Sequence, residues 1–482
     1  MECKQLPETQ CRLPRCVYVN TQKRKYCRKA NNTKRINPVQ VKVQPVRTTM
    51  EKQKATRKIT QFIKASTKIL NIVCGVSGEC LSFGKSVEEI KHFFKGFTHF
   101  DYVTGPLKSI GGPTANGFIR EIEYNRESYS AYAILKSNQS ESSDSLVYEY
   151  MVGINFINQV AKQFPCFVNT YGLFFYKDMN AYNHIESNPT LPDGKQVLLD
   201  SLDLQHTVDY KKACVHAQRA VVLIQHIHNA LSLQKTFSIG GHFIKYDMGY
   251  VFFIIYQALA SMSKVYTHYD LHRENVLLFR PFPDKVIHYV YHGKNGIVQF
   301  NCPYVPKIID YGRCFFDNGG LNSKIIYDKV CSIKECGKCG QDYGFTLMSP
   351  TPWNTISVQQ KNESHDLRLM TQLDYHLPYV RSNKAKSYYT KGKLCNPLLK
   401  MISKIKYGES LTSSNKDFGT LEDTTLHPKG DIVANVTDAY NELKKMITNL
   451  KVIEENNKMY PPDTIGGELH IYENGPMEFF RK

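Results

Sequence analysis

The most informative part of the sequence is the stretch HYDLHRENVLL, residues 268–278. It places Asp270, His272 and Asn275 in a short polar segment that runs directly into the strand-like residues VLL. Thirty-five residues after Asn275, a second strand-like run, KII, leads into the tripeptide DYG at residues 310–312. A lone Asp-Tyr-Gly is usually a turn, so the interpretation depends on the order and spacing of the segments together.

Three further segments occupy fixed places relative to these two. The strand-like AILK ends at Lys136, and Glu149 follows thirteen residues later in a predicted helix over residues 143–164. Ahead of them lies IGGPTANGFI, residues 110–119, which contains three glycines: Gly111, Gly112 and Gly117. Glycines let the backbone approach a ligand closely and point N–H groups at it. Downstream, SHDLRL at residues 364–369 opens another predicted helix.

In this order the motifs resemble those of protein kinases, over roughly residues 103–375. The idiom DLHxxN followed by VLL, together with LIQHIHNA and SHDLRL, is similar to the kinase-domain proteins of giant DNA viruses. The resemblance implies an α+β, bilobal protein-kinase-like fold with a β-rich N-lobe and a mainly helical C-lobe. It also implies a viral Ser/Thr protein kinase that transfers the γ-phosphoryl group of ATP, with Mg²⁺, to protein hydroxyls.

The resemblance also implies roles for individual residues. Lys136, tethered by Glu149, holds the α- and β-phosphates of ATP beneath the three glycines. Asn275 and Asp310 hold Mg²⁺. Asp270 orients the attacking hydroxyl and accepts its proton. In the segment at residues 364–369, the Asp is expected to accept hydrogen bonds from the backbone of the catalytic loop.

Three departures from the kinase pattern leave the acceptor open. Tyr269 stands where many kinases carry an Arg that receives an activation-loop phosphate, so switching by that route is not expected. His272 replaces a Lys on the γ-phosphate and also resembles small-molecule kinases, although it could simply cap the loop. SPTP, residues 349–352, is a poor substitute for A-P-E. The alternatives to a protein kinase are a small-molecule kinase and a pseudokinase or scaffold.

The charge of the chain is concentrated at its beginning. Of the formal net charge of +18, residues 1–60 contribute 16 − 3 = +13, and the remainder is nearly balanced. Such an arm could contact nucleic acid or an acidic partner, or could be a solvated tail. The longest apolar run, YVFFIIY at residues 250–256, is too short for a membrane span. With no apolar signal segment visible, we expect a cytoplasmic protein of an infected host cell or a virion component.

Cysteine and histidine residues offer a second kind of site. Four cysteines follow the DYG in a pattern that could hold structural Zn²⁺, although reduced thiols are the simpler interpretation: Cys314, Cys331, Cys336 and Cys339. Four histidines lie among residues predicted to be helical, and we interpret them as packing or surface groups and not as ligands: His206, His216, His226 and His228.

The predicted organisation has four parts: a basic low-order arm at 1–58, a helical prelude at 59–100, a kinase-like N-lobe at 101–204, and a kinase-like C-lobe with insertions and a C-terminal extension at 205–482. The pattern predicts a strand at 195–202 (KQVLLDSL). It predicts long helices at 213–231 and 248–266, and one amphipathic helix at 438–456.

Overall fold

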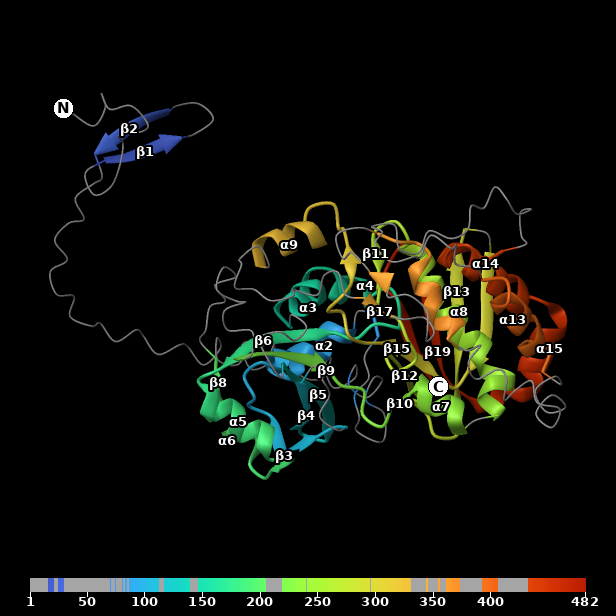
Figure 1. Ribbon diagram of the computed structural model, residues 1–482, viewed down its shortest axis with the longest axis horizontal. Helices are drawn as coiled ribbons and strands as arrows, with labels where there is room; N and C mark the ends of the chain where they lie inside the picture. The colour runs from blue at the N-terminus through green and yellow to red at the C-terminus, as the bar shows by residue number, and fades with distance from the viewer. Residues whose placement is uncertain are drawn as a thin grey trace, which may run out of the picture. The chain divides into compact units, whose positions relative to one another are not determined.

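The computed structural model describes most of the chain from Ser86 to Lys482 (Figure 1). Its gaps in that range are residues 112–116, 139–145, 205–218, 240, 295, 331–343, 346–353, 356–360, 373–391 and 406–431. Before Ser86 it describes Leu70, Cys74, Cys80, Phe83 and Gly84, together with two strands near the N-terminus.

The chain divides into two compact units, Met1–Ile63 and Lys64–Lys482. In the first unit, strand β1 (Cys16–Asn20) pairs antiparallel with β2 (Lys25–Lys29), a hairpin that the sequence did not predict within the basic arm. The rest of residues 1–58 lies outside the described residues, so the predicted partner of the arm remains a prediction.

A seven-stranded antiparallel sheet forms the first half of the second unit, in the order β7-β3-β4-β5-β9-β6-β8. Its strands are β3 (Val103–Ser109), β4 (Gly117–Arg126), β5 (Tyr129–Asn138), β6 (Thr170–Tyr176), β7 (Thr190–Leu191), β8 (Leu202–Asp203) and β9 (Ala220–Gln225). Three helices accompany it: α2 (Ser86–Phe93), α5 (Met179–Ser187) and α6 (Gly194–Ser201).

The two faces of this sheet differ in burial. Along β4 and β5 the side chains alternate between fully and partly buried positions, because successive residues of a strand point to opposite faces. One face, including Ile122 and Leu135, joins a hydrophobic core with the residues around α6. The other face carries Glu121 and Lys136.

The prediction of a long helix at 213–231 was wrong, because residues 220–225 form strand β9. Every residue of this strand is buried, with Val221 and Leu223 in one core and Val222 and Ile224 in the other. A strand buried on both faces has no alternation of polar and apolar residues, so it resembles a buried helix in sequence. Since β9 pairs with β5 and β6, the sheet extends past the predicted N-lobe boundary at 204.

The predicted strand at 195–202 was also wrong, because these residues form most of helix α6. The side chain of Asp193 caps the helix by accepting a hydrogen bond from the backbone N–H of Gln196 at 3.2 Å. The buried residues of α6 recur at helical spacing: Gly194, Leu198 and Ser201. The prediction failed because a short apolar run of β-prone residues does not distinguish a strand from a helix.

Most of the predicted helix at 143–164 is present, over residues 146–160, as a continuous helical segment that changes type, and residues 143–145 lie outside the described residues. It runs through α3 (Leu146–Val152), a π-helical turn at Gly153–Ile157, and α4 (Asn158–Val160). The π turn falls where Gly153 passes close to Thr170, since a Cβ on this glycine would lie 2.1 Å from the Thr170 hydroxyl.

The second half of the unit is organised around helix α8 (Met248–Ser261), which is buried along nearly its whole length. A three-stranded sheet, in the order β10-β12-β15, and a four-stranded sheet, in the order β14-β13-β19-β20, are the larger sheets here. Their strands are β10 (Leu231–Ser232), β12 (Val276–Phe279), β13 (Val286–Gly293), β14 (Gly296–Cys302), β15 (Val305–Ile308), β19 (Ile465–Tyr472) and β20 (Glu478–Arg481).

Further helices complete this half, and Figure 1 shows α13, α14 and α15 at the end of the unit opposite α5 and α6. The helices are α7 (Leu233–Ile239), α9 (Ser323–Val330), α10 (Arg368–Thr371), α13 (Cys395–Ile402), α14 (Val436–Ile447) and α15 (Leu450–Met459). The short strand pairs are β11 (Tyr266–Thr267) with β16 (Phe315–Phe316), and β17 (Gly344–Phe345) with β18 (Asn354–Thr355). The single helix predicted at 438–456 is therefore two helices, with Asn449 capping the second.

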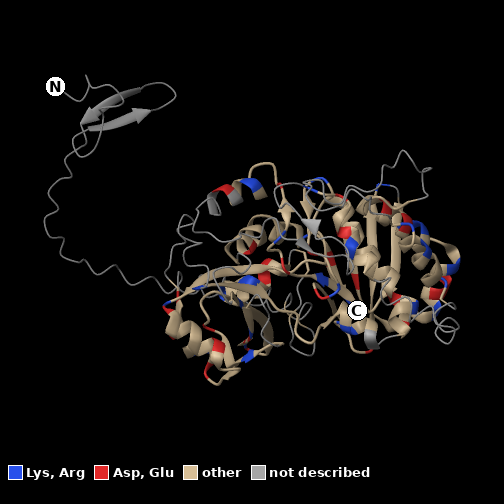
Figure 2. Ribbon diagram, in the orientation of Figure 1, with Lys and Arg blue, Asp and Glu red and all other residues tan. Residues whose placement is uncertain are grey.

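The fold class is mixed α+β, as the sequence predicted. Acidic and basic residues are interspersed over α14 and α15 (Figure 2), in keeping with the nearly balanced charge outside the arm. Within the described part of the chain, no helix combines the length and apolarity needed to cross a bilayer.

Cys74 and Cys80 form a disulfide that the sequence did not predict.

Candidate functional site

The amine of Lys136 lies between two carboxylates that come from distant parts of the chain. Near the end of β5, Lys136 Nζ donates to Glu149 Oε2 of α3 at 2.8 Å and to Asp310 Oδ1 at 2.9 Å. Asp310 follows β15 by two residues. The Glu149 side chain is only 1% exposed, whereas those of Lys136 and Asp310 are 19% and 28% exposed. The site is thus buried on the α3 side and accessible on the Asp310 side.

The charges in this cluster support one another. Burial on its own lowers the pKa of Lys136, but the charges of Asp310 and Glu149 outweigh it and hold that pKa above its ordinary value. Burial likewise raises the pKa of Asp310, and the ammonium of Lys136 overcomes this and brings that pKa to about 2. Lys136 and Asp310 are therefore both charged at neutral pH.

Two backbone positions near the site have positive φ. Tyr269, which precedes Asp270, has a φ of 62°, and Asp310 itself has a φ of 69°. Such conformations are uncommon in residues other than glycine and concentrate at functional sites, where the surrounding structure must hold them. Tyr311 helps to hold Asp310: its ring is fully buried, and its hydroxyl donates to the backbone oxygen of Ile308 at 2.8 Å.

The loop that carries Asp270 is held from below by Asp366. The buried Asp366 carboxylate accepts from the backbone N–H of His268 at 2.7 Å and from that of Tyr269 at 3.0 Å. The sequence predicted this contact. It ties the loop to the turn that leads into α10, and His268 Nε2 adds a bond of 3.1 Å to the backbone oxygen of Ile309, beside Asp310.

Two arginines that the sequence analysis missed contact the Asp270 carboxylate. Arg368 Nη1 lies 3.1 Å from Asp270 Oδ1, and Arg313 Nη1 lies 3.6 Å from Asp270 Oδ2. Arg368 follows Asp366 by two residues and Arg313 follows the DYG directly, so both lie inside segments already singled out. Residue types and spacing alone did not indicate that their side chains would turn toward Asp270.

His272 contacts the loop and also faces Asp270. Its Nδ1 accepts from the backbone N–H of Glu274 at 3.2 Å, which is the contact expected of a capping residue. The ring proton of the neutral form is therefore on Nε2, which lies 3.8 Å from Asp270 Oδ1. Burial lowers the pKa of His272, while the charge of Asp270 acts in the opposite direction. At neutral pH the imidazole is accordingly uncharged.

Asn275 lies at the same strand end as Asp310. Its Nδ2 donates to the backbone oxygen of Asp270 at 3.0 Å, and its own backbone oxygen accepts from the N–H of Ile309 at 3.0 Å. Strand β12 begins right after Asn275 and pairs with β15, Val276 lying opposite Ile308. This pairing brings the predicted segments at 268–275 and 310–312 together.

Of the three predicted glycines, two are described. Gly117 begins β4 with a φ of 144°, and a Cβ there would lie 1.8 Å from the backbone oxygen of Ser137. Only glycine fits at this point next to β5. Gly111 has a φ of 70° and open space around it, and Gly112 lies outside the described residues.

Of the four cysteines predicted to hold zinc, only Cys314 lies among the described residues. Cys314 is buried, and its Sγ lies 3.2 Å from the hydroxyl of Tyr266. Burial raises the pKa of this thiol, which disfavours the thiolate that zinc requires. The other three, Cys331, Cys336 and Cys339, and the SPTP segment lie outside the described residues.

Four histidines were interpreted as packing or surface groups, and two of them lie in a cluster of side chains that could bind a metal ion. His226 and His228 follow β9, and one ring nitrogen of each histidine approaches the carboxylate of Glu121 on β4. The sequence could not show this, because the contact depends on the sheet register and on β9 being a strand. His206 and His216 lie outside the described residues.

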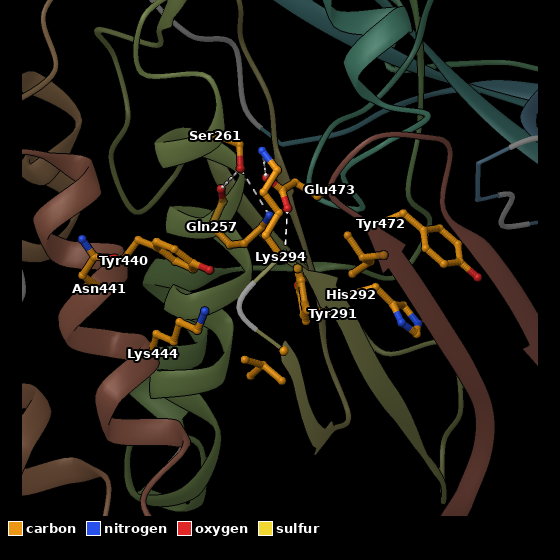
Figure 3. Close-up of a pocket in the computed structure, with 14 residues that line it drawn as sticks. Gln257, Ser261, Tyr291, His292, Lys294, Tyr440, Asn441, Lys444, Tyr472 and Glu473 are labelled. Atoms are coloured by element: carbon orange, nitrogen blue, oxygen red, sulfur yellow. Dashed lines mark hydrogen bonds and ion pairs between the residues drawn. The ribbon is translucent and has the colours of Figure 1, made fainter.

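A pocket of about 310 Å³ opens elsewhere, among α8, α14, β13 and β19 (Figure 3). Lys294 on its rim pairs with Glu473 at 3.3 Å, and Lys444 of α14 lies on another side. None of the residues predicted for the site lines it.

The sequence was compared with models of protein families and with curated proteins. No protein-family model matches the sequence, and no curated protein matches it either. The functional interpretation therefore depends on the geometry of the site and on the motifs that it contains.

Proposed function

We propose that the chain is an ATP- and Mg²⁺-dependent phosphotransferase with a bilobal, protein-kinase-like fold, acting on Ser or Thr hydroxyls of proteins. The observation that carries the proposal is the placement of Lys136 between Glu149 and Asp310. The Lys136 amine contacts one carboxylate 13 residues away in the chain and another 174 residues away, and these are the residue types that the kinase motifs combine. The seven-stranded sheet and the half built around α8 support a bilobal description.

The residues fit a magnesium nucleotide. Asp310 and Asn275 offer the carboxylate and amide oxygens that Mg²⁺ prefers, and they lie at one strand end. Bound Mg²⁺ supplies neutralisation of the phosphate charge. Lys136, held by the buried Glu149, is positioned to bind phosphate oxygens, and the accessible side of the cluster at Asp310 faces the ligand.

Asp270 acts on the acceptor. It orients the hydroxyl for in-line attack and takes its proton as the new O–P bond forms and the bond from the γ-phosphorus to the ADP oxygen breaks. Arg368 and Arg313 fix the carboxylate of Asp270 through contacts at 3.1 Å and 3.6 Å. Because the transition state is loose, positioning and charge neutralisation supply most of the acceleration.

The test is phosphate transfer from γ-labelled ATP with Mg²⁺, using the full chain alone and with a basic acceptor protein. Asp270→Asn is expected to lower turnover by about 10²- to 10⁴-fold while ATP binding persists. Asp310→Ala is expected to abolish both turnover and Mg²⁺-dependent binding. Asp463→Asn, at an exposed carboxylate, serves as the matched control and should behave as the native chain. Undiminished turnover in Asp270→Asn would remove Asp270 from the mechanism.

The same assay separates the alternatives. Transfer to small alcohols such as sugars or choline, with none to proteins, would identify a small-molecule kinase. Magnesium-dependent ATP binding with no transfer to either class would identify a pseudokinase or scaffold. Absence of ATP binding to the native chain would contradict the proposal as a whole.

A further inference from the structure

Glu121, His226 and His228 converge on one point from two parts of the seven-stranded sheet. Glu121 Oε2 lies 3.0 Å from His226 Nε2 and 2.9 Å from His228 Nδ1. One possible ligand atom from each residue lies within 4.8 Å of the other two. The side chains are 13%, 16% and 29% exposed, so the cluster is largely enclosed but retains one accessible side.

The sheet backbone holds two of the three residues in place. Glu121 lies opposite Ile134 of β5, and Ile134 lies opposite Ile224 of β9, so the register sets Glu121 near the end of β9. His226 continues that strand end, and its N–H donates to the backbone oxygen of Tyr132 at 3.0 Å. The sheet therefore fixes the backbone at Glu121 and His226, while His228 lies in the turn after β9.

The ring of His228 is also positioned. It stacks on Tyr132, with ring centroids 4.2 Å apart and an interplanar angle of 12°. His226 comes directly after β9, and His228 lies in the turn that follows. Two oriented imidazoles and one carboxylate thus meet without long, flexible side chains.

This donor set is one that zinc uses. Two His and one Glu leave a fourth position for water or another ligand, the arrangement of open zinc sites. With ligand bonds of about 2.0–2.1 Å, tetrahedral geometry separates ligand atoms by about 3.3 Å. The separations of 2.9 Å and 3.0 Å are close to this, so small side-chain shifts suffice to admit an ion.

We propose that Glu121, His226 and His228 form a binding site for a transition-metal ion of the Zn²⁺ type. The ion links β4 to the segment that leaves the sheet after β9 toward α7. The site is separate from the proposed Mg²⁺ residues, although Glu121 and Lys136 lie on the same face of the sheet. The alternative is a pair of hydrogen bonds from the two histidines to Glu121 with no ion.

The experiment measures metal content and spectrum in the full chain. The protein is stripped with a chelator, then titrated with Zn²⁺ or Co²⁺. The native chain is expected to bind one more zinc ion than the double variant His226→Gln with His228→Gln. The comparison isolates this site from any zinc held by cysteines. His184→Gln, at an exposed histidine of α5, is the matched control and should bind as the native chain does.

The visible spectrum of bound Co²⁺ distinguishes nitrogen and oxygen ligands from sulfur ligands. Visible d–d bands without an accompanying sulfur-to-cobalt charge-transfer band are expected, and the double variant should lose them. Zinc should raise the Tm of the native chain and not that of the variant. If the double variant does not fold, Glu121→Gln takes its place. Equal zinc content and an equal Tm response in the native chain and the variant would overturn the site, as would a native cobalt spectrum without these bands.

Discussion

Lys136 and Lys307 are two lysines on strands, the first partly buried and the second fully buried, and their surroundings differ. Lys136 on β5 has a carboxylate on each side, at 2.8 Å and 2.9 Å. Lys307 on β15, only 3% exposed, donates instead to the backbone oxygen of Phe167 at 3.2 Å and lies 5.6 Å from the ring centroid of Phe83. Burial lowers the pKa of Lys307 to about 8, against a small opposing effect of Cys166.

The difference shows what the acidic partners accomplish. Burial penalises the charge of any lysine, and only nearby carboxylates reverse the penalty. Around Lys136 there are two, and they hold its pKa above the ordinary value. Lys307 has one backbone oxygen as its acceptor, whereas Lys136 is held between two carboxylates.

The largest effect is expected from removing the buried acid beside Lys136. Glu149→Leu should lower the free energy of unfolding by about 3 kcal/mol, because it leaves a buried ammonium with only the more exposed Asp310. The double variant Lys136→Met with Glu149→Leu should lose less than the sum of the two single variants. Urea denaturation of the four proteins measures both quantities. Additive losses would show that the pair is not coupled.

A smaller effect is expected from Asp310 at acid pH. Its pKa of about 2 lies below the value of about 3.9 for an unfolded Asp, so the unfolded state binds the proton first as the pH falls. The carboxylate thus contributes about 2–3 kcal/mol of stability above pH 4, which is lost as the pH falls toward 2. The difference in unfolding free energy between the native chain and Asp310→Asn should shrink over that interval. For the exposed control Asp463→Asn it should stay constant.

Local motifs made part of this site predictable. Lys136, Glu149 and Asp310 each lie in a short segment whose residue types carry information without any knowledge of tertiary contacts, and the structure brings the three together. The contact of Asp366 with the loop backbone was predicted for the same reason. The arginines that contact Asp270 were not, because the direction of a side chain is set by packing.

Contacts that depend on strand register could not be predicted from the sequence. Strand β9 is apolar on both faces, and its periodicity does not distinguish it from a helix. With β9 assigned to a helix, His226 and His228 could not be placed beside Glu121, since that contact crosses β5. Helix α6 was missed because the capping role of Asp193 was not recognised.

The smallest effect, and the most direct test of the comparison, is at Lys307. Between about pH 8 and the ordinary lysine pKa near 10.4, the unfolded chain holds a proton that the folded chain has lost. Stability attributable to this group therefore rises with pH over that interval. Below pH 8 the folded chain must keep a buried ammonium, so Lys307→Met should be more stable than the native chain at pH 7. The gain is about 1–2 kcal/mol, since loss of the bond to Phe167 offsets part of it.

Denaturation of the native chain and Lys307→Met from pH 7 to pH 10 measures this difference, which should decrease as the pH rises. Lys400→Met, at an exposed lysine of α13, should show no such trend. A difference that stays constant with pH would mean that Lys307 keeps its charge when buried. The fold would then tolerate a buried ammonium without an acid, and the two carboxylates beside Lys136 could not be explained by burial alone.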